Sequence, residues 1–195
     1  PFGFQHEENL KLDIIAISKH FGGGLPISAV CTMADVAKRA VGRGYFATRS
    51  HATGPLLCAA GEESLDIVVE EDMPGKAAQI ERRIKFAFRK MAKEFEWIGD
   101  IRGRGVLLGI EFVKGRAAKA PANEETQAVY DYALDKGLIF QVRGVRELKN
   151  FIRLMPPMTS TCEEVDRALS TLYDAFSGLG KHGSKRKTAT TGSKT

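Results

Sequence analysis

The most informative segment of the sequence is Asp13-Ile-Ile-Ala-Ile-Ser-Lys19-His-Phe-Gly22-Gly-Gly24-Leu-Pro26. Ile14 to Ile17 form a short continuous apolar block, which is typical of a strand covered on both faces in an α/β sheet. Lys19 follows the carboxyl end of this strand, where open α/β sheets place their ligands. The glycines after it let the backbone adopt positive φ angles and approach another group closely.

Lys19 has a specific chemical use at such a place. Its amine can form a Schiff base with an aldehyde, especially when the side chain is partly buried. Lysines are also common as exposed residues at strand ends. The spacing alone therefore leaves open a reactive lysine and an ordinary surface lysine.

The segment Ser18-Lys19-His-Phe-Gly22-Gly-Gly24-Leu-Pro26 resembles the S-K-x-x-G-x-G-x-P signature of class III aminotransferases. These are fold-type I enzymes that use pyridoxal 5'-phosphate (PLP). The resemblance covers roughly residues 1 to 178 and implies that Lys19 holds PLP as a Schiff base. It also implies amino-acid and 2-oxo-acid substrates and a homodimer with shared active sites. Within the family the sequence is most similar to the 2,2-dialkylglycine decarboxylases. Decarboxylation and plain transamination therefore both remain open as the reaction.

The expected fold is α/β, with the C-terminal part of the PLP-binding large domain followed by a small α+β domain. Residues 1–73 are expected to belong to the large domain, residues 74–96 to a linking helix, and residues 97–178 to the small domain. Residues 179–195 are expected to form a disordered basic tail.

Local patterns predict the elements in more detail. A capping box at Thr161 and Glu164 opens the last helix, which is expected to end near Phe176, and Asn123 is expected to cap the helix before it. The other predicted helices cover residues 34–41, 56–69, 75–95 and 123–136, and the predicted strands cover residues 14–17, 27–33, 106–113, 138–142 and 151–155.

Three glycines between residues 101 and 113 invite a dinucleotide-binding interpretation. The G-x-G-x-x-G spacing excludes it, because position 108 is Leu108 and no strand is evident before the first glycine. The segment instead resembles the glycine-shaped strand that opens the small domain of the family, and we assign it a structural role.

Arg153 lies in Phe151-Ile-Arg153-Leu-Met-Pro156-Pro157, a short apolar strand that stops at a double proline. On pattern alone it is either an edge-strand arginine with its head in solvent or a fork for a carboxylate. In the family an arginine of an F-R-x-x-P-P segment binds the substrate α-carboxylate. Counted back from the double proline, Arg153 takes that role.

The loop before Pro55 carries hydroxyl groups at the start of a predicted helix, an arrangement that suits a phosphate and is also found in ordinary polar loops. In the family a hydroxyl of this loop reaches the PLP phosphate of the partner subunit. Aligning His51 and Pro55 gives this role to Ser50, with Thr53 as the alternative. Gly54 replaces the aspartate that helps the decarboxylases to bind an alkali-metal ion, so no metal is expected. His51 itself is expected to be structural.

The composition excludes several other classes of protein. Five basic residues and no acid lie between Lys181 and Thr195, so this segment accounts for the whole net charge of +5 and gives no reason to expect a nucleic-acid partner. No apolar run approaches the ~20 residues that span a bilayer, and residues 1–8 do not resemble a signal peptide. The cysteines, Cys31, Cys58 and Cys162, are expected to be reduced and buried in a cytoplasmic protein.

The family chain is longer than this one, which begins at Pro1. The resemblance includes neither a glycine-serine phosphate loop nor an aromatic residue that stacks on the PLP ring. It also lacks the aspartate that pairs with the pyridinium nitrogen. The chain is therefore expected to be cut from a longer protein, and a truncated, catalytically inactive relative is the alternative to an active PLP enzyme.

Overall fold

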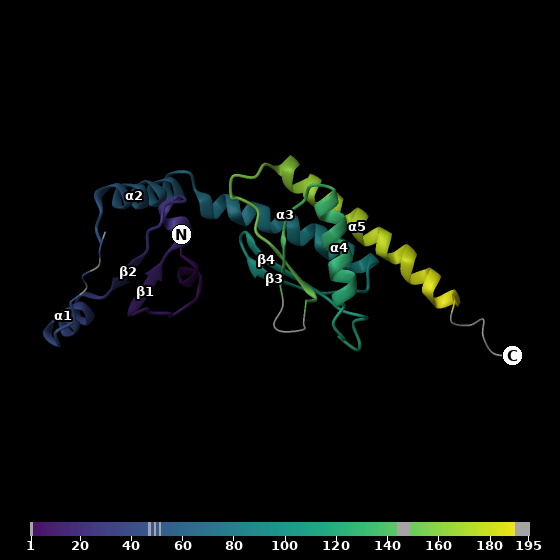
Figure 1. The fold of residues 1–195 in the computed structure, drawn as a ribbon, viewed down its shortest axis with the longest axis horizontal. Coiled ribbons are helices and arrows are strands. Elements are labelled where there is room, and N and C mark those ends of the chain that lie inside the picture. Colours follow the sequence, from purple (N-terminus) through teal and green to yellow (C-terminus); the bar gives the residue numbers. More distant parts are fainter. Residues whose placement is uncertain (1, 47, 49, 51, 144–148, 190–195) are drawn as a thin grey trace. The chain divides into compact units, whose positions relative to one another are not determined.

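The computed structural model describes residues 2–46, 48, 50, 52–143 and 149–189, and the chain divides into two compact units (Figure 1). Unit 1 comprises Pro1–Pro74 and unit 2 comprises Gly75–Thr195. The finer division into large domain, linking helix and small domain stays a prediction. Within the described residues, no helix is both long enough and apolar enough to cross a membrane.

Unit 1 is built from short elements around one pair of strands. β1 pairs antiparallel with β2, with Ile14 opposite Thr32 and Ile17 opposite Ala29. The elements of the unit are η1 (Gly3–His6), β1 (Ile14–Ile17), η2 (Lys19–Gly22), β2 (Ala29–Thr32), α1 (Ala34–Gly42) and α2 (Pro55–Glu70). Pro55 occupies the first turn of α2, where a missing N–H leaves no helical hydrogen bond unmade.

The predicted position of β1 is correct, but its predicted burial on both faces is wrong. Ile14 is 59% exposed, and Val30 on β2 is 72% exposed. In the part of the chain that the structure describes, the sheet of β1 contains only β2 as a second strand. An apolar block predicts burial only where further elements are present to cover it.

The cysteines are also exposed, contrary to the prediction of buried thiols. Cys31 lies on β2, Cys58 on α2 and Cys162 at the start of α5, and all three are free and exposed. Cys31 and Cys58 belong to the sparsely covered unit 1, and Cys162 lies at a helix end.

Unit 2 combines a four-stranded antiparallel sheet of order β3-β4-β6-β5 with long helices. Its elements are α3 (Met73–Glu94, of which the first two residues are counted in unit 1), β3 (Ile98–Arg104), β4 (Leu107–Phe112), α4 (Asn123–Asp135), β5 (Gln141–Arg143), β6 (Phe151–Leu154) and α5 (Cys162–Ala189). Along β4 the residues alternate, since Leu108, Ile110 and Phe112 are buried and their neighbours are not. One face of the sheet therefore packs on the core.

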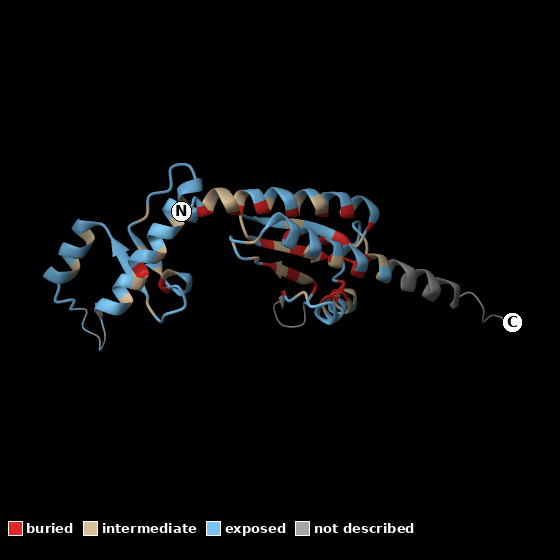
Figure 2. Cartoon of the chain, turned by 90° about the horizontal axis from the view of Figure 1, so that it is seen from above, coloured by how far each residue is buried: buried red, intermediate tan, exposed pale blue. Residues whose placement is uncertain are grey.

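The core of unit 2 is formed by the sheet and by α3, α4 and α5 together. Figure 2 shows buried residues along α3 and the strands of this unit, whereas the elements of unit 1 are mostly exposed. Phe88 and Phe176 are fully buried, and the ring of Trp97 meets that of Phe176 edge-to-face at 4.8 Å between centroids. Such aromatic packing adds to the stability that burial alone provides.

Strand β3 was missed by the sequence analysis, which found no strand before the glycines. Charged residues and glycines hide its alternation, because only Ile98 and Ile101 are large and apolar. Gly103 has a φ of +118°, and a Cβ there would lie 2.0 Å from the carbonyl oxygen of Leu107. The glycines therefore shape a hairpin between β3 and β4.

Three boundaries also differ from their predictions. Ala122, not Asn123, is the N-cap of α4, because the Oδ1 of Asn123 accepts a hydrogen bond from the backbone N–H of Lys149. Strand β5 begins at Gln141, later than predicted. Helix α5 continues to Ala189 instead of ending near Phe176, and Leu179 extends its apolar stripe onto the core. The predicted disordered tail is thus helical to Ala189, and residues 190–195 lie outside the described residues.

Candidate functional site

Lys19 begins the short helix η2 directly after β1, as the sequence predicted for its position. Its φ of +62° is in the left-handed region, which a residue with a side chain rarely adopts and which costs roughly 1–3 kcal/mol. The side chain is exposed, so the partial burial expected for a reactive amine is absent. Within the described residues, no hydrogen bond or ion pair holds the Lys19 amine.

The loop after Lys19 is anchored on α2 by two buried glycines. A Cβ on Gly22 would lie 2.5 Å from the Cγ2 of Ile27, so only glycine fits there without movement. A Cβ on Gly61 of α2 would lie 3.0 Å from the ring of Phe21. The close approach of Phe21 to Gly61 therefore fixes the loop that carries Lys19 against α2.

The hydroxyl loop lies in the same unit. Thr53 has a φ of 56°, and its Oγ1 donates a hydrogen bond to the carbonyl of Ala52 at 2.7 Å. Ser50 is exposed, and His51, which was expected to be structural, lies outside the described residues. The N-cap of α2 is Gly54, which has no side chain, so no N-cap side chain occupies the first backbone N–H groups of this helix.

Arg153 lies on β6 in unit 2, opposite Gly109 of β4 and Gln141 of β5. A Cβ on Gly109 would lie 2.2 Å from the Cε2 of Phe151, so the ring of Phe151 fills the space that Gly109 leaves open. Phe151 and Arg153 are two residues apart and thus share one face of the sheet. Arg153 is half-buried and has no hydrogen bond or ion pair with any other described residue.

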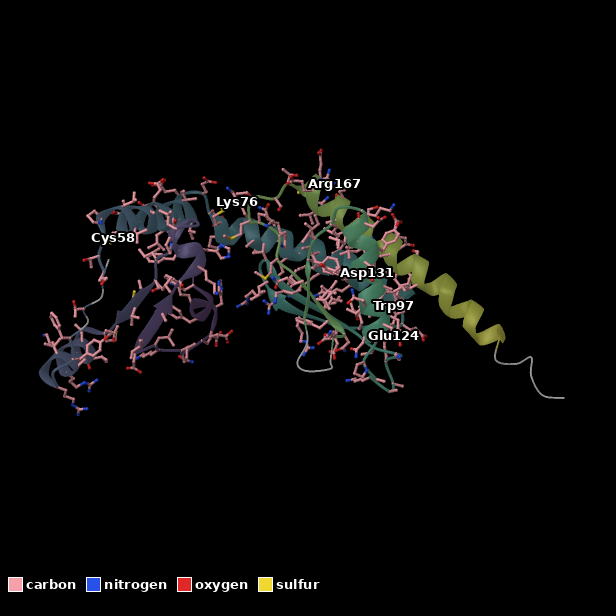
Figure 3. The ribbon with its side chains drawn as sticks, in the orientation of Figure 1. Cys58, Lys76, Trp97, Glu124, Asp131 and Arg167 are labelled. Atoms are coloured by element: carbon pink, nitrogen blue, oxygen red, sulfur yellow. The ribbon has the colours of Figure 1, made fainter. Side chains whose placement is uncertain are left out.

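Arg153 also lines a cavity of about 630 Å³ within unit 2. The cavity lies among α3, the segment that leads into β5, the end of β6 and the first turns of α5. Its walls are mostly apolar, and Glu164 and Arg167 of α5 also line it. Arg167 is labelled on α5 in Figure 3.

Apart from Arg153, the residues around this cavity were not predicted from the sequence to belong to a binding site. Arg167 looks like any exposed arginine on a helix surface, and Leu138 and Phe140 look like ordinary strand residues. Only the double proline after β6 marks the place where the chain turns toward α5. The cavity results from tertiary packing and has no local signal in the sequence.

The structure does not group all the predicted site residues in one unit. Lys19, Ser50 and Thr53 belong to unit 1, and Arg153 belongs to unit 2. Their roles as parts of one active site stay a prediction, and the geometry of each is described within its own unit.

Comparison with known proteins agrees with the resemblance at the level of the family. The family described as "Aminotransferase class-III" matches residues 1–176. The mitochondrial alanine–glyoxylate aminotransferase 2 of Pongo abelii is 32% identical over 89% of this chain and 33% of its own length. A leucine/methionine racemase of Thermococcus litoralis is 32% identical over 91% of this chain and 39% of its own length.

A solved structure shows the same fold. An aminotransferase of Bacillus anthracis matches 90% of this chain and 41% of its own chain, with a TM-score of 0.81 and 28% identity. The chain spans about a third of the length of the curated relatives it matches. The α/β fold seen here is thus that of about two fifths of a solved aminotransferase chain.

Proposed function

The chain belongs to the class III aminotransferase family, and from this premise we propose that it carries the cofactor lysine and the substrate-binding arginine of a PLP-dependent enzyme. Lys19 binds PLP through its amine, Ser50 or Thr53 binds the phosphate of the PLP held by the partner subunit, and Arg153 binds the substrate α-carboxylate. The observation that carries the proposal is Lys19 itself. It combines an unpaired amine with a left-handed backbone at a strand end, and such strained residues cluster at functional sites.

The residues present in unit 1 fit PLP. The Lys19 amine is exposed and is not engaged by another described residue, which leaves it open to a covalent bond. The uncapped start of α2 offers backbone N–H groups and the positive end of a helix dipole to a phosphate. The hydroxyls of Ser50 and Thr53 come shortly before this helix start and supply further donors.

The chemistry follows from the positions of these side chains. When bound, PLP supplies a conjugated ring that stabilises negative charge at the substrate Cα. Arg153 orients the carboxylate with its planar fork, and orientation determines which bond to Cα is broken. The Nζ of Lys19 serves as the base or acid that takes a proton from Cα or returns it.

We propose transamination between an amino acid and a 2-oxo acid as the reaction, in a homodimer. The relatives are named for different reactions, one as an aminotransferase and another as a racemase. The resemblance to 2,2-dialkylglycine decarboxylases has no specific support among them, and decarboxylation stays the alternative reaction. The cytoplasmic location also stays a prediction, since one relative is named as mitochondrial.

The test is the selective reaction of Lys19 with PLP. The chain is incubated with PLP, reduced with borohydride and mapped by mass spectrometry. We expect Lys19 to be labelled at least about tenfold more than the exposed Lys38 of α1, and to see an absorbance band at roughly 410–430 nm. Lys19→Ala should remove this band and Lys38→Ala should not. Equal labelling of both lysines would contradict the proposal and favour the inactive relative.

A further inference from the structure

Helix α2 has an exposed face whose charges are all acidic. The helix contains no Lys or Arg, and its acids are all exposed: Glu62, Glu63, Asp66 and Glu70. We call these four residues the acidic face. Gly61 and Ser64, on the other side of the helix, lie against the loop after Lys19. None of the four acids forms an ion pair or a side-chain hydrogen bond with another described residue.

The outward side of α3 has the opposite charge. Its exposed residues there are Arg82, Phe86, Arg89, Lys90 and Lys93, which we call the basic face. Elsewhere on this helix the charges are paired, Lys85 with Glu81 and Arg83 with Asp166. The four cations of the basic face have no acidic partner among the described residues. The Nζ of Lys90 lies 4.4 Å from the centroid of the Phe86 ring, so this exposed ring is flanked by positive charge.

Like charges repel one another within each face. Glu62, Asp66 and Glu70 follow at i,i+4 spacing, as do Arg89 and Lys93, and like charges at this spacing destabilise a helix. An exposed helix whose charges only face solvent commonly mixes both signs, so that i,i+4 pairs attract. A partner of opposite charge would relieve the repulsion on both faces.

We infer that the acidic face of α2 in one copy of the chain docks on the basic face of α3 in a second copy. Four negative charges then meet four positive charges. At 1.5 Å per residue, Glu62 to Glu70 span about 12 Å and Arg82 to Lys93 about 16 Å, so the two rows have similar lengths. Val69 of α2 and Phe86 are 67% and 60% exposed and supply an apolar contact between the charges. Such complementary charge steers association and determines its register.

The inference does not rest on the proposed function. The homodimer proposed there shares active sites, whereas the acidic and basic faces include neither Lys19, Ser50 and Thr53 nor Arg153. Docking therefore requires no PLP, and the test uses the full chain without the cofactor.

Sedimentation equilibrium measures the Kd of the dimer at 100 mM and 1 M NaCl. The Debye length falls from about 10 Å to about 3 Å between these concentrations, which screens exposed charges from one another. We expect a dimer whose Kd rises about tenfold or more at the higher salt concentration. A monomer at 100 mM NaCl, or a dimer with the same Kd at both concentrations, would overturn the inference.

Charge-reversal variants locate the contact. One variant reverses the basic face with Arg82→Glu, Arg89→Glu and Lys93→Glu. A second reverses the acidic face with Glu62→Lys, Asp66→Lys and Glu70→Lys. Each alone should raise the Kd of the dimer about tenfold or more, because the faces that meet then carry the same charge. Unfolding followed by Trp97 verifies that unit 2 of each variant is folded.

Two further variants separate local charge from net charge. The control reverses three exposed lysines outside both faces, Lys11→Glu, Lys38→Glu and Lys114→Glu, and changes the net charge as much as reversal of the basic face does. It should leave the Kd unchanged. The chain with both faces reversed keeps the net charge of +5 and has complementary faces again, so it should dimerise as the unchanged chain does. If it stayed monomeric, or if the control weakened the dimer as much, the inference would be wrong.

The same measurements separate this inference from the proposed function. Lys19→Ala should dimerise as the unchanged chain does. Selective PLP labelling of Lys19 without a salt-dependent dimer would refute the docking of α2 on α3 and leave the PLP role intact. A dimer that follows the charge reversals, without selective labelling, would refute the PLP role alone.

Discussion

The two units differ in whether they bury their own apolar side chains. Unit 2 encloses a core that runs from α3 through the sheet to α5. In unit 1, the buried residues among those described are Gly22, Gly61 and Met73, while Ile14 of β1 and Leu56 of α2 are 59% and 74% exposed (Figure 2). The residues proposed to hold the cofactor thus lie in the unit with little core, and the residue proposed to hold the carboxylate lies in the unit that closes on itself.

Unit 1 leaves large apolar side chains such as Ile14, Val30 and Leu56 exposed. Exposed apolar surface of this extent is typical of a face that another polypeptide covers. We therefore expect PLP binding at Lys19 to become tighter when another polypeptide covers unit 1, and carboxylate binding at Arg153 to be independent of such a partner. Variants that act on one unit and leave the other unchanged test this difference between the units.

The largest effect is expected from Phe88→Ala in the core of unit 2. Phe88 is fully buried, and its ring lies 6.0 Å from that of Phe176. Truncation of such a side chain lowers the free energy of unfolding by about 3–5 kcal/mol. Trp97 is the single tryptophan of the chain and packs on Phe176, so its fluorescence during urea unfolding reports on this unit.

Two controls test whether the effect belongs to the core of unit 2. Phe86→Ala on the same helix removes a ring that is 60% exposed, and Ile14→Ala changes unit 1. Both should shift the Trp97 transition by less than about 0.5 kcal/mol. If Ile14→Ala lowered the free energy of unfolding reported by Trp97 as much as Phe88→Ala does, the two units would share one cooperative core. The proposed difference between the units would then be wrong.

Local rules of sequence were sufficient where an element is determined by its own residues. The apolar face of α3 predicted a long helix, and the capping box at Thr161 and Glu164 is formed by reciprocal hydrogen bonds. The double proline correctly marked the region where β6 ends. Each of these features depends only on residues that are close together in the sequence.

Features that depend on distant residues could not be predicted in the same way. Strand β3 exists because β4 pairs with it, although its own residues are mainly glycine and charged. The burial of β1 depends on neighbours outside its own sequence, so an apolar block proved no guide to exposure. Arg153 was identified from its motif, but the cavity beside it is formed by segments far apart in the chain.

An intermediate effect is expected from Gly109→Ala on β4, opposite Arg153, the residue proposed to bind the carboxylate. The new Cβ would lie 2.2 Å from the ring of Phe151, so the ring must move. Overpacking of this kind costs about 1–3 kcal/mol, and the Trp97 transition should shift accordingly.

The matched change in unit 1 is Gly61→Ala, which places a Cβ 3.0 Å from the ring of Phe21. It should disturb the loop of Lys19 and reduce selective PLP labelling while it leaves the Trp97 transition unchanged. The assignment of Lys19 and Arg153 to separate units would be wrong if Gly61→Ala shifted the Trp97 transition and Gly109→Ala reduced the PLP labelling of Lys19.

The smallest effect is expected from the ion pair that ties the β3–β4 hairpin to α3. Glu81 accepts hydrogen bonds from Lys85 and from the backbone N–H of Gly105, both at 2.6 Å, and Lys85 also donates to the carbonyl of Gly103. The Glu81 and Lys85 side chains are only 19% and 22% exposed. Burial alone would raise the pKa of Glu81, but these bonds and the charges of Lys85 and Arg104 together lower it.

The sign of the pH dependence follows from this lowered pKa. Because Glu81 holds its proton less tightly in the folded chain than in the unfolded chain, its contribution to stability is complete well above pH 4.5 and is lost as the pH falls through its folded pKa. Glu81→Gln should therefore lower the free energy of unfolding of unit 2 at pH 7 by up to about 1 kcal/mol, and by less at pH 3.5. Urea unfolding followed by Trp97 measures both, with Glu124→Gln, an exposed glutamate of α4, as the control. A loss that is the same at both pH values would mean that the ionised carboxylate does not hold the hairpin, and that α3 and the sheet are joined by apolar packing alone.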